Sequence, residues 1–360
     1  MSNPALSNTH FTTSSGGSQA QPAQGGREKF GAEELAIVMS HFDVGIIREL
    51  REFPRGSRKA PKLYIDAEHG QFLLKRRARG RDDAKKVAFA HHIQLHLAQQ
   101  QYPLPHLIGT RNDNNSMLQL NGLIYELFEF IPGQGYPMTL ESTFESGRVL
   151  ALYHKLLENF PTDGAPPGAS FHNAYAVEQG LKSIAGTRSG EFKQVCEYLI
   201  VAYHDAALKV EGLGLSGWPL QIVHADWHPG NMLFRDGKIV AVIDYDSARV
   251  LPRVIDVANG ALQFSIVRSD EDVSQWPDYL DESRFKRFLR GYDTVVLLSQ
   301  AELDAVPWLM IESMIAEAVI PILQTGHFSK FDGVAFMTMV RRKVIWIRQR
   351  AAELVALAAE

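Results

Sequence analysis

Cysteine, excess positive charge and long apolar runs are all scarce in this sequence, and each absence excludes a class of protein. The 360 residues contain one cysteine, Cys196, so no internal disulfide can form and a reducing, cytoplasmic location is expected. We expect Cys196 to be a small, buried apolar residue. The formal net charge is −4, with 37 basic and 41 acidic residues, so the chain lacks the positive field that a nucleic-acid partner requires.

Membrane and export signals are scarce as well. Charged residues interrupt every hydrophobic stretch before about 18 residues, so no membrane-spanning segment and no membrane partner are predicted. The N-terminus has neither the basic start nor the apolar run of a signal peptide, so we expect no secretory leader. Residues 1–26 are instead rich in Ser, Gly, Gln, Asn, Thr and Pro, and we expect them to form a disordered tail.

The remaining sequence predicts two lobes of different character. Between residues 27 and 131, strand-like segments at 44–53 and 62–77 precede a helix at 82–101, and two further strands flank the Asn121-Gly122 hairpin signal. Residues 132–360 predict a mainly helical lobe, with helices at 140–160, 174–211, 254–265, 281–299, 308–323 and 333–359. The predicted fold class is therefore α+β, with a small antiparallel-sheet N-terminal lobe containing one long helix and a larger helical C-terminal lobe.

One β-rich stretch, "IVHADWHPGNMLFRDGKIVAVIDYD" at residues 222–246, stands alone within the helical lobe. Asp236-Gly237 is a strong signal for a two-residue hairpin turn, because both central residues of such a turn take positive φ. With this dipeptide at the tip, the register pairs Leu233 with Val240. The polar residues of the stretch then gather at the open end of the hairpin.

The same register brings three oxygen-bearing side chains to one edge. Asn231 opens the hairpin and lies beside Asp244, which closes it, and the loop that holds Asp226 runs into the same end. Mg²⁺ in proteins prefers carboxylate and amide oxygens, so Asn231 and Asp244 suit a metal site completed by phosphates. Asp226 is then left free to accept a proton from an attacking hydroxyl. This division of roles is typical of phosphoryl transfer.

The run "HADWHPGN", followed by "VIDYD", resembles the aminoglycoside phosphotransferase and choline kinase family, whose pattern is H-x-D-x-x-x-x-N with an aspartate ending a later strand. The segment "PLPHLIGTRNDNNSMLQLNGLIYELFEFIPG" is similar to its homoserine kinase and spore-coat kinase-like branches. The resemblance implies a protein-kinase-like fold, ATP and Mg²⁺ as cofactors, Asp226 as catalytic base, and Asn231 and Asp244 as metal ligands. It also implies that His224 braces the catalytic loop.

The resemblance further implies the nucleotide contacts. "FLLKR" matches the strand whose lysine, here Lys75, contacts the α- and β-phosphates, and "FPRGSRKAP" stands where relatives cover the nucleotide, offering Ser57. "YELFEFIPG" matches the hinge between the lobes, so adenine is expected to meet the backbone of Glu129, Phe130 and Ile131. His228 either lines the site or makes a structural hydrogen bond. Asp246 is expected to be a secondary metal ligand or an outer residue that supports one.

One feature departs from the family pattern. The helix after the Lys75 strand should carry a glutamate that pairs with the lysine, but "KKVAFAHH" contains no acid. Asp82 and Asp83 lie at the start of this helix, so either an aspartate substitutes or Lys75 is oriented differently. A catalytically weak nucleotide-binding pseudokinase is therefore an alternative to an active enzyme.

The acceptor is the least determined part of the prediction. The relatives act on aminoglycosides, choline, homoserine, sugars and, in some cases, protein side chains. We predict a small molecule with a hydroxyl group: an amino alcohol, an amino sugar, a sugar or a homoserine-like amino acid. The amine-bearing acceptors are favoured because the acid-rich segment 269–283 could attract them. Glu312 and Glu317, on an apolar helix, are further candidates for the acceptor site.

Two other functions could use the same residues. A protein serine/threonine kinase of the same fold would need an open acceptor groove rather than an enclosed pocket. His224, Asp226 and His228 form an H-x-D-x-H motif that could ligate zinc for hydrolysis, although the sequence offers no obvious cluster to complete the shell. The sequence leaves the oligomeric state open.

Overall fold

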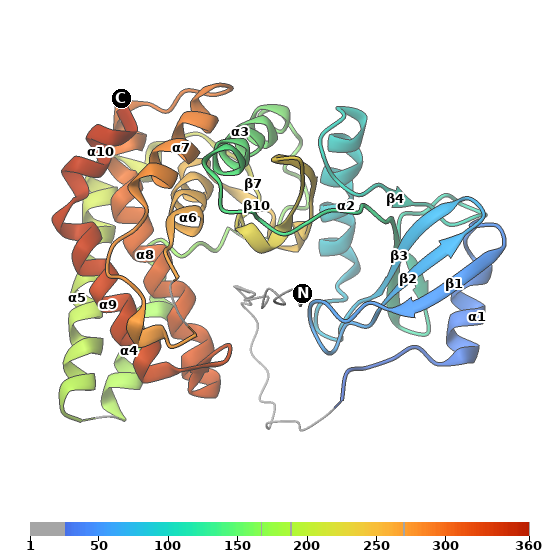
Figure 1. Cartoon of the computed structure of the whole chain (residues 1–360), viewed down its shortest axis with the longest axis horizontal. Helices are drawn as coiled ribbons and strands as arrows, with labels where there is room; N and C mark the ends of the chain where they lie inside the picture. The colour runs from blue at the N-terminus through green and yellow to red at the C-terminus, as the bar shows by residue number, and fades with distance from the viewer. Residues whose placement is uncertain (1–25, 167, 188, 269–270, 360) are drawn as a thin grey trace, which may run out of the picture.

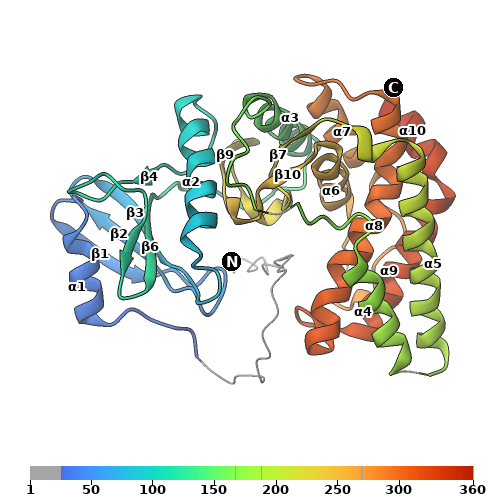
Figure 2. The same cartoon turned by 180° about the vertical axis from the view of Figure 1, so that it is seen from behind.

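The computed structural model describes residues 26–359 apart from 167, 188, 269 and 270. The tail expected at residues 1–26 lies outside the described residues, except for Gly26. Figures 1 and 2 show two lobes side by side, with the N-terminal sheet in one and most of the helices in the other. This is the two-lobed α+β architecture predicted from the sequence.

The small lobe is built on an antiparallel sheet. Its elements are α1 (Ala32–Ser40), β1 (Ile47–Glu52), β2 (Lys62–Ala67), β3 (Gly70–Arg76), β4 (Leu107–Ile108), β5 (Leu118–Leu120) and β6 (Leu123–Glu129). The strand order is β1-β2-β3-β6-β4, and β5 pairs with β6. Fully buried side chains from adjacent strands, Ile65, Leu74 and Leu127, form its core together with residues of α1.

Helix α2 (Ala84–Gln99) connects the two lobes. Asp83 caps its N-terminus by accepting hydrogen bonds from backbone N–H groups of the first turn. In both views α2 stands between the sheet and the large lobe (Figures 1 and 2), and its Phe89 and Ile93 belong to the hydrophobic core of the large lobe. The helix is therefore held by the large lobe, although it follows the small-lobe strands in sequence.

The large lobe is mainly helical. Its helices are α3 (Leu140–Leu156), α4 (Tyr175–Gly186), α5 (Glu191–Gly212), α6 (Val254–Ser265), α7 (Glu282–Asp293), α8 (Gln300–Thr325), α9 (Gly333–Gln349) and α10 (Ala351–Ala359). The single helix predicted at 174–211 is two helices, because Gly190 takes a φ of 68° just before α5. The helix predicted at 308–323 begins earlier, because Ser299 and Glu302 form a capping box. The helix predicted at 281–299 ends at Asp293, and the helix predicted at 333–359 is interrupted at Arg350.

Helix α8 is the core helix of this lobe. It is the one helix among the described residues that is long and apolar enough to cross a membrane, but 67% of its most apolar window is buried inside the protein. Ile311, Ile315 and Val319 are fully buried. Burial among other helices therefore accounts for its apolar sequence.

Three short antiparallel strand pairs complete the large lobe. They are β7 (Leu220–Val223) with β10 (Arg249–Pro252), β8 (Met232–Arg235) with β9 (Lys238–Val242), and β11 (His327–Phe328) with β12 (Phe331–Asp332). The predicted turn forms at Asp236-Gly237, with φ angles of 50° and 74°. A bulge shifts the register of β8 and β9, so Leu233 faces Ala241 and the predicted pairing with Val240 is wrong by one residue.

Candidate active site

The loop that carries Asp226 is fixed by a buried carboxylate beneath it. The backbone N–H groups of His224 and Ala225 donate to Oδ2 and Oδ1 of Asp256 at 2.6 and 2.7 Å. Asp256, in the first turn of α6, is fully buried and also lies 3.3 Å from His154 Nε2. Ala225 has a φ of 58°, an unfavourable angle that this pair of hydrogen bonds maintains. The backbone leading into Asp226 is therefore held in one conformation.

Asp226 is nearly buried and makes specific polar contacts. Asn231 Nδ2 donates to its Oδ2 at 2.9 Å, and His228 Nε2 lies 3.5 Å from its Oδ1. His228 Nδ1 accepts the N–H of Gly230 at 3.0 Å, which places a ring proton on Nε2, toward Asp226. Burial would raise the pKa of Asp226, but His228, His224 and Asn231 outweigh it and lower the pKa below its ordinary value. Asp226 is therefore an ionised hydrogen-bond acceptor.

Asp244 lies where the hairpin predicts it, next to Asn231. The N–H of Ile243 donates to the backbone O of Asn231 at 2.9 Å, so the chain just after β9 is adjacent to the chain just before β8. The exposed Asp244 carboxylate makes no hydrogen bond or ion pair with any described residue. The amide nitrogen of Asn231 is engaged by Asp226, which leaves its Oδ1 to bind a ligand. A free carboxylate beside an amide oxygen fits a divalent cation such as Mg²⁺.

Neither ring nitrogen of His224 has a hydrogen-bond partner among the described residues, so its bracing role stays a prediction, whereas the surroundings of the ring contradict the zinc interpretation. Its fully buried ring packs against Tyr153, Trp227 and Tyr245, with centroid distances of 5.9, 5.5 and 5.3 Å. Burial lowers the pKa of His224 below its ordinary value, so the ring is neutral. Within the described residues, no group of three or more His, Cys, Asp or Glu side chains could hold a metal ion. The H-x-D-x-H motif is therefore not a zinc site.

Lys75 is paired with acids that the family pattern does not predict. Its Nζ lies 3.5 Å from Oε2 of Glu126, on β6, and 3.7 Å from Oδ2 of Asp246. Asp83 caps α2, and Asp82 accepts a hydrogen bond within its own loop, so neither aspartate replaces the missing helix glutamate. Burial disfavours the ammonium, but Asp246 and Glu126 raise the pKa of Lys75 above its ordinary value. Asp246 thus supports the lysine.

A second lysine, Lys62, lies beside Lys75 and is not part of the sequence prediction. The two are cross-strand partners on β2 and β3. Burial and the charge of Lys75 lower the pKa of Lys62 to about 8, and Asp244 partly offsets this. The Lys62 side chain makes no hydrogen bond or ion pair with the residues that the structure describes. Lys62 is therefore a cation that forms no ion pair with a described acid, although the charges of Asp244, Asp246 and Glu126 act on it.

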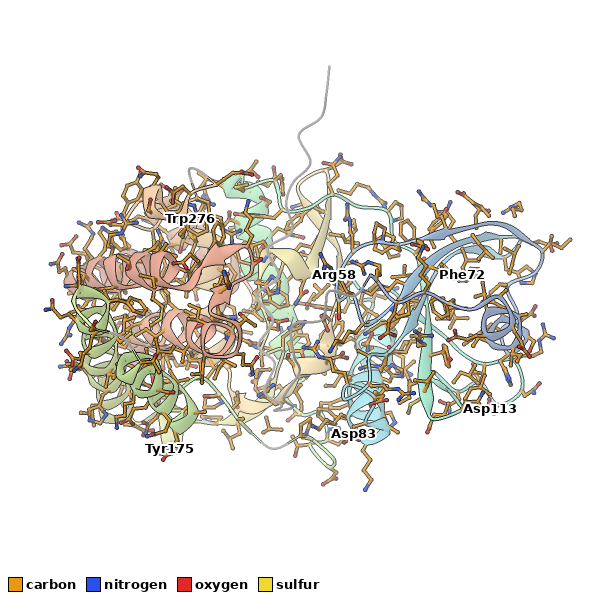
Figure 3. All side chains as sticks on the ribbon, turned by 90° about the horizontal axis from the view of Figure 1, so that it is seen from below. Arg58, Phe72, Asp83, Asp113, Tyr175 and Trp276 are labelled. Atoms are coloured by element: carbon orange, nitrogen blue, oxygen red, sulfur yellow. The ribbon has the colours of Figure 1, made fainter. Side chains whose placement is uncertain are left out.

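The loop between β1 and β2 lies over this lysine. Phe53 N–H donates to Lys62 O at 2.9 Å and closes the base of the loop that contains Ser57. Lys62 Nζ lies 3.0 Å from the point where a Cβ on Gly56 would stand, so the glycine allows close approach. Figure 3 shows Arg58, also in this loop, on the side of the small lobe that faces the large lobe. The loop thus lies over Lys62 and faces the large lobe, and its role as a nucleotide cover stays a prediction.

Part of the predicted hinge backbone is already used by the sheet. The N–H groups of Glu129 and Phe130 donate to the carbonyl oxygens of His106 and Gln71 at 2.8 and 2.9 Å. These two donors therefore belong to the sheet and are not available to adenine. Of the three predicted hinge residues, Ile131 keeps its backbone N–H free of any hydrogen bond to a described residue.

Of the two glutamates predicted on α8, the structure brings one toward Asp226. The negative charge of Asp226 raises the pKa of Glu317. Glu312 is fully buried and contacts a different part of the lobe. Its carboxylate lies 2.8 Å from His172 Nδ1 and accepts the N–H of Asn173 at 2.9 Å. Glu312 therefore binds the loop before α4 and is not available to an acceptor molecule.

Glu317 accepts hydrogen bonds from two uncharged side chains, and His228 and Arg268 are the cations that act on it. Gln263 Nε2 donates to Glu317 Oε2 at 2.7 Å, while the buried Oε1 of Gln263 has no hydrogen-bond partner among the described residues. Ser313 Oγ carries one proton and lies 3.2 Å from Glu317 Oε1 and 2.9 Å from Asn259 Oδ1. Burial and the negative charge of Asp226 raise the pKa of Glu317 to about 7, although His228 opposes the shift. We call Asn259, Gln263, Ser313 and Glu317 the α6–α8 cluster.

The acid-rich segment at 269–283 does not supply a carboxylate to this cluster. Among its described residues, Asp272 caps a short helical turn, Asp278 pairs with Arg342 at 2.9 Å, and Asp281 caps α7. These acids already cap helices or form an ion pair. The argument for an amine group in the acceptor therefore depends on the α6–α8 cluster instead.

Some of these residues carried a signal in the sequence and some did not. Glu126 is an isolated acid within the apolar run "LIYELF", which indicates a buried charge with a partner. The hairpin turn after Ala67 sets the register of β2 and β3, so it also determines that Lys62 faces Lys75. Gln263, in contrast, reaches Glu317 only through the packing of α6 on α8, which no local pattern encodes.

Comparison with known proteins shows the family. The sequence profile of the Phosphotransferase enzyme family (APH) matches residues 49–295, more than half of the chain. The chain belongs to this family. The phosphotransferase is 26% identical over 283 residues to the homoserine kinase of Caulobacter sp. (strain K31), and the alignment covers 77% of this chain and 81% of that protein.

Solved structures share its fold. The aminoglycoside phosphotransferase from Alicyclobacillus acidocaldarius has 16% identity and a TM-score of 0.66, with coverage of 93% of this chain and 98% of that one. An amicoumacin kinase, solved in complex with AMP-PNP and Ca²⁺, has 14% identity and a TM-score of 0.63, with coverage of 87% and 93%. The predicted kinase-like fold and the predicted family are confirmed.

Proposed function

We propose that this phosphotransferase transfers the γ-phosphoryl group of ATP to a hydroxyl of an amine-bearing small molecule, with Asp226 as the catalytic base. The observation that carries the proposal is the meeting of Asp226, Asn231 and Asp244 at the open end of the β8–β9 hairpin. Bound Mg²⁺–ATP supplies the phosphoryl group and the positive charge that offsets the phosphates.

Asp226 orients the acceptor hydroxyl. Its carboxylate is ionised, and Asn231 holds Oδ2 at 2.9 Å. His228 lies 3.5 Å from Oδ1, which is beyond a strong hydrogen bond, so Oδ1 remains able to accept one from a hydroxyl. A carboxylate in this position directs the oxygen toward the phosphorus atom and takes the proton as the new bond forms.

The nucleotide is held by groups from both lobes. Asn231 Oδ1 and the Asp244 carboxylate, from the large lobe, are the oxygen atoms suited to Mg²⁺. Lys75 and Lys62, from the small lobe, are the cations suited to the phosphate oxygens. The backbone N–H of Ile131 is the hinge donor that remains for adenine.

The α6–α8 cluster favours an ammonium group in the acceptor. Oxygen atoms of Glu317 and Asn259 share the single hydroxyl proton of Ser313, and Gln263 Oε1 has no donor among the described residues. A buried acceptor without a donor is costly, and an ammonium group brings three donors and a positive charge. The nearby Asp226 carboxylate adds to the negative potential. A neutral sugar would satisfy some of these oxygens but would add no positive charge.

Arg268 extends the same site to acceptors that also carry a carboxylate. It interacts electrostatically with Glu317, and its guanidinium lies 5.5 Å from the centre of the Trp276 ring. An acceptor with both an ammonium and a carboxylate therefore meets complementary charges. The similarity to a homoserine kinase agrees with this class, since homoserine carries both groups and a hydroxyl.

An ATP-consumption screen with matched acceptor pairs tests the proposal. Each pair consists of an alcohol with an amine and the same alcohol without it, and the panel includes homoserine, choline, amino sugars and a serine-containing peptide. We expect turnover with one or more amine-bearing small alcohols and little with their neutral partners. Equal turnover of both partners would remove the amine from the proposal, and turnover of the peptide alone would indicate a protein kinase.

A further inference from the structure

The family pattern places the acid that pairs with the phosphate-binding lysine on the helix after its strand, and this phosphotransferase has no acid there. We propose that Glu126, on the neighbouring strand β6, is the positioning residue for Lys75, and that Glu126, Arg77 and Asp246 form a latch between the lobes. The inference rests on the proposed role of Lys75 at the phosphates. It names which residues set the position of that lysine.

The sheet itself brings Glu126 to Lys75. The two residues are directly opposed in the antiparallel pair of β3 and β6, where side chains on one face are close neighbours. Glu126 is fully buried, and its Oε2 lies 3.5 Å from Lys75 Nζ. That oxygen makes no hydrogen bond with any described residue, so its charge remains directed at the lysine. Burial would raise the pKa of Glu126, but Lys75 and Arg77 lower it well below its ordinary value.

The other oxygen of Glu126 is held by two different elements. Arg77 NH2 donates to Glu126 Oε1 at 2.7 Å, and His91 Nε2 lies 2.7 Å from the same atom. His91 is on α2, and its Nδ1 lies 2.8 Å from Ser116 Oγ. The helix that carries the acid in the family pattern therefore contacts this acid through a histidine instead.

Arg77 links Glu126, in the small lobe, to Asp246, in the large lobe. Its NH1 and NH2 donate to Oδ2 and Oδ1 of Asp246 at 3.0 and 2.8 Å, a two-bond arrangement that fixes both groups. Asp246 also lies 3.7 Å from Lys75 Nζ and follows the metal-binding Asp244 by two residues. Two cations and two anions are thus interlocked, and 5% of Arg77 is exposed. Removing one charge leaves its partners buried and unbalanced.

This arrangement places the acid that positions Lys75 in the sheet, with α2 contacting that acid through His91. An acid on α2 would make the lysine depend on where α2 lies, whereas an acid on β6 belongs to the same sheet as the lysine. The latch instead ties Lys75 to the segment that holds Asp244. The lysine and the metal-binding aspartate are therefore set at a fixed separation before nucleotide binds.

Binding of Mg²⁺–AMP-PNP, measured by titration calorimetry, tests the latch without an acceptor. We expect Glu126→Gln and Asp246→Asn each to weaken binding about tenfold or more, because Lys75 loses its fixed partner. Arg76→Gln is the matched control: Arg76 lies between Lys75 and Arg77 on β3, but it pairs with Glu28 and Glu34 away from the site. It should bind as wild type does. Wild-type affinity in both latch variants would overturn the proposal.

A relocated acid distinguishes positioning from general structural damage. His91 already contacts Glu126 from α2, so Glu126→Gln combined with His91→Glu returns an acid to the helix that has it in the family pattern. We expect this double variant to recover most of the lost affinity. No recovery, with melting temperatures equal to wild type, would contradict a positioning role. If Glu126→Gln does not fold, Asp246→Asn, whose side chain is 27% exposed, decides the question by the same measurement.

Lys75→Met separates this inference from the proposed function. Lost nucleotide affinity in Lys75→Met, with wild-type affinity in Glu126→Gln and Asp246→Asn, would overturn the latch and leave the role of Lys75 intact. Wild-type affinity in Lys75→Met would overturn the phosphate contact itself.

Discussion

The side-chain amide of Asn231 donates two hydrogen bonds to Asp226, one to Oδ2 at 2.9 Å and one to the backbone O at 3.0 Å. A single residue thus holds the proposed base through its nitrogen and keeps its oxygen available to a cation beside Asp244. The base and the metal site therefore depend on the same side chain.

Asn231→Ala should lower both turnover and Mg²⁺ affinity. Loss of the two hydrogen bonds frees Asp226 to move, and loss of Oδ1 removes a metal ligand. Effects of about 10- to 100-fold on each quantity are expected, the range found when supporting residues of metal sites are removed. Steady-state kinetics at several Mg²⁺ concentrations separate the two. A change in turnover with no change in Mg²⁺ dependence would exclude Asn231 as a ligand.

Asp244→Asn should act mainly on binding of the metal–nucleotide complex. The carboxylate makes no hydrogen bond or ion pair with described residues, so its removal costs the fold little and takes one charge from the cation site. We expect affinity for Mg²⁺–AMP-PNP to fall about tenfold or more. Asp236→Asn, at the exposed tip of the same hairpin, is the matched control and should bind normally, since asparagine tolerates its φ of 50°. Equal affinities in the two variants would reassign the metal site.

Glu317→Gln should raise the KM for an amine-bearing acceptor and leave the KM for ATP unchanged. A hydrogen bond to a charged group contributes about 1.5–3 kcal/mol, which corresponds to roughly 10- to 150-fold in KM. Asp304→Asn, on the same helix and paired only with Gln300 among the described residues, serves as the control. If Glu317→Gln left the acceptor KM unchanged, the ammonium would have to bind elsewhere.

The same substitution should stabilise the protein at high pH. Burial raises the pKa of Glu317 to about 7, above its ordinary value of 4.5. Between these values the folded state keeps a proton that the unfolded state has lost, so the free energy of unfolding falls as pH rises through this window. Glutamine does not titrate. The melting temperature of Glu317→Gln should therefore exceed that of wild type above pH 7, and the difference should shrink toward pH 4.5. A difference independent of pH would contradict this account.

The proximity of the proposed catalytic residues could be predicted because their spacing is local. Asp226, Asn231 and Asp244 belong to one loop and one hairpin, and the Asp236-Gly237 turn sets their approach even though a bulge shifts the register by one residue. The bulge lies within the hairpin and does not change which residues meet at its open end.

The remainder of the site depends on contacts between distant segments. Glu126 and Lys75 meet through the pairing of strands far apart in sequence, which the missing helix glutamate signalled without locating. Glu312 and Glu317 lie on the same apolar helix with similar sequence surroundings. Glu317 contacts α6, whereas Glu312 contacts the loop before α4. No periodicity in the sequence predicts this difference.

The turnover of Asp226→Asn, measured beside its affinity for Mg²⁺–AMP-PNP, tests the central claim most directly. Asparagine keeps the shape of the side chain but cannot accept the proton, so we expect turnover to fall about 10²- to 10⁴-fold while nucleotide affinity stays close to that of wild type. Turnover near the wild-type rate would contradict the assignment of Asp226 as the base and, with it, the proposed phosphoryl transfer at this site.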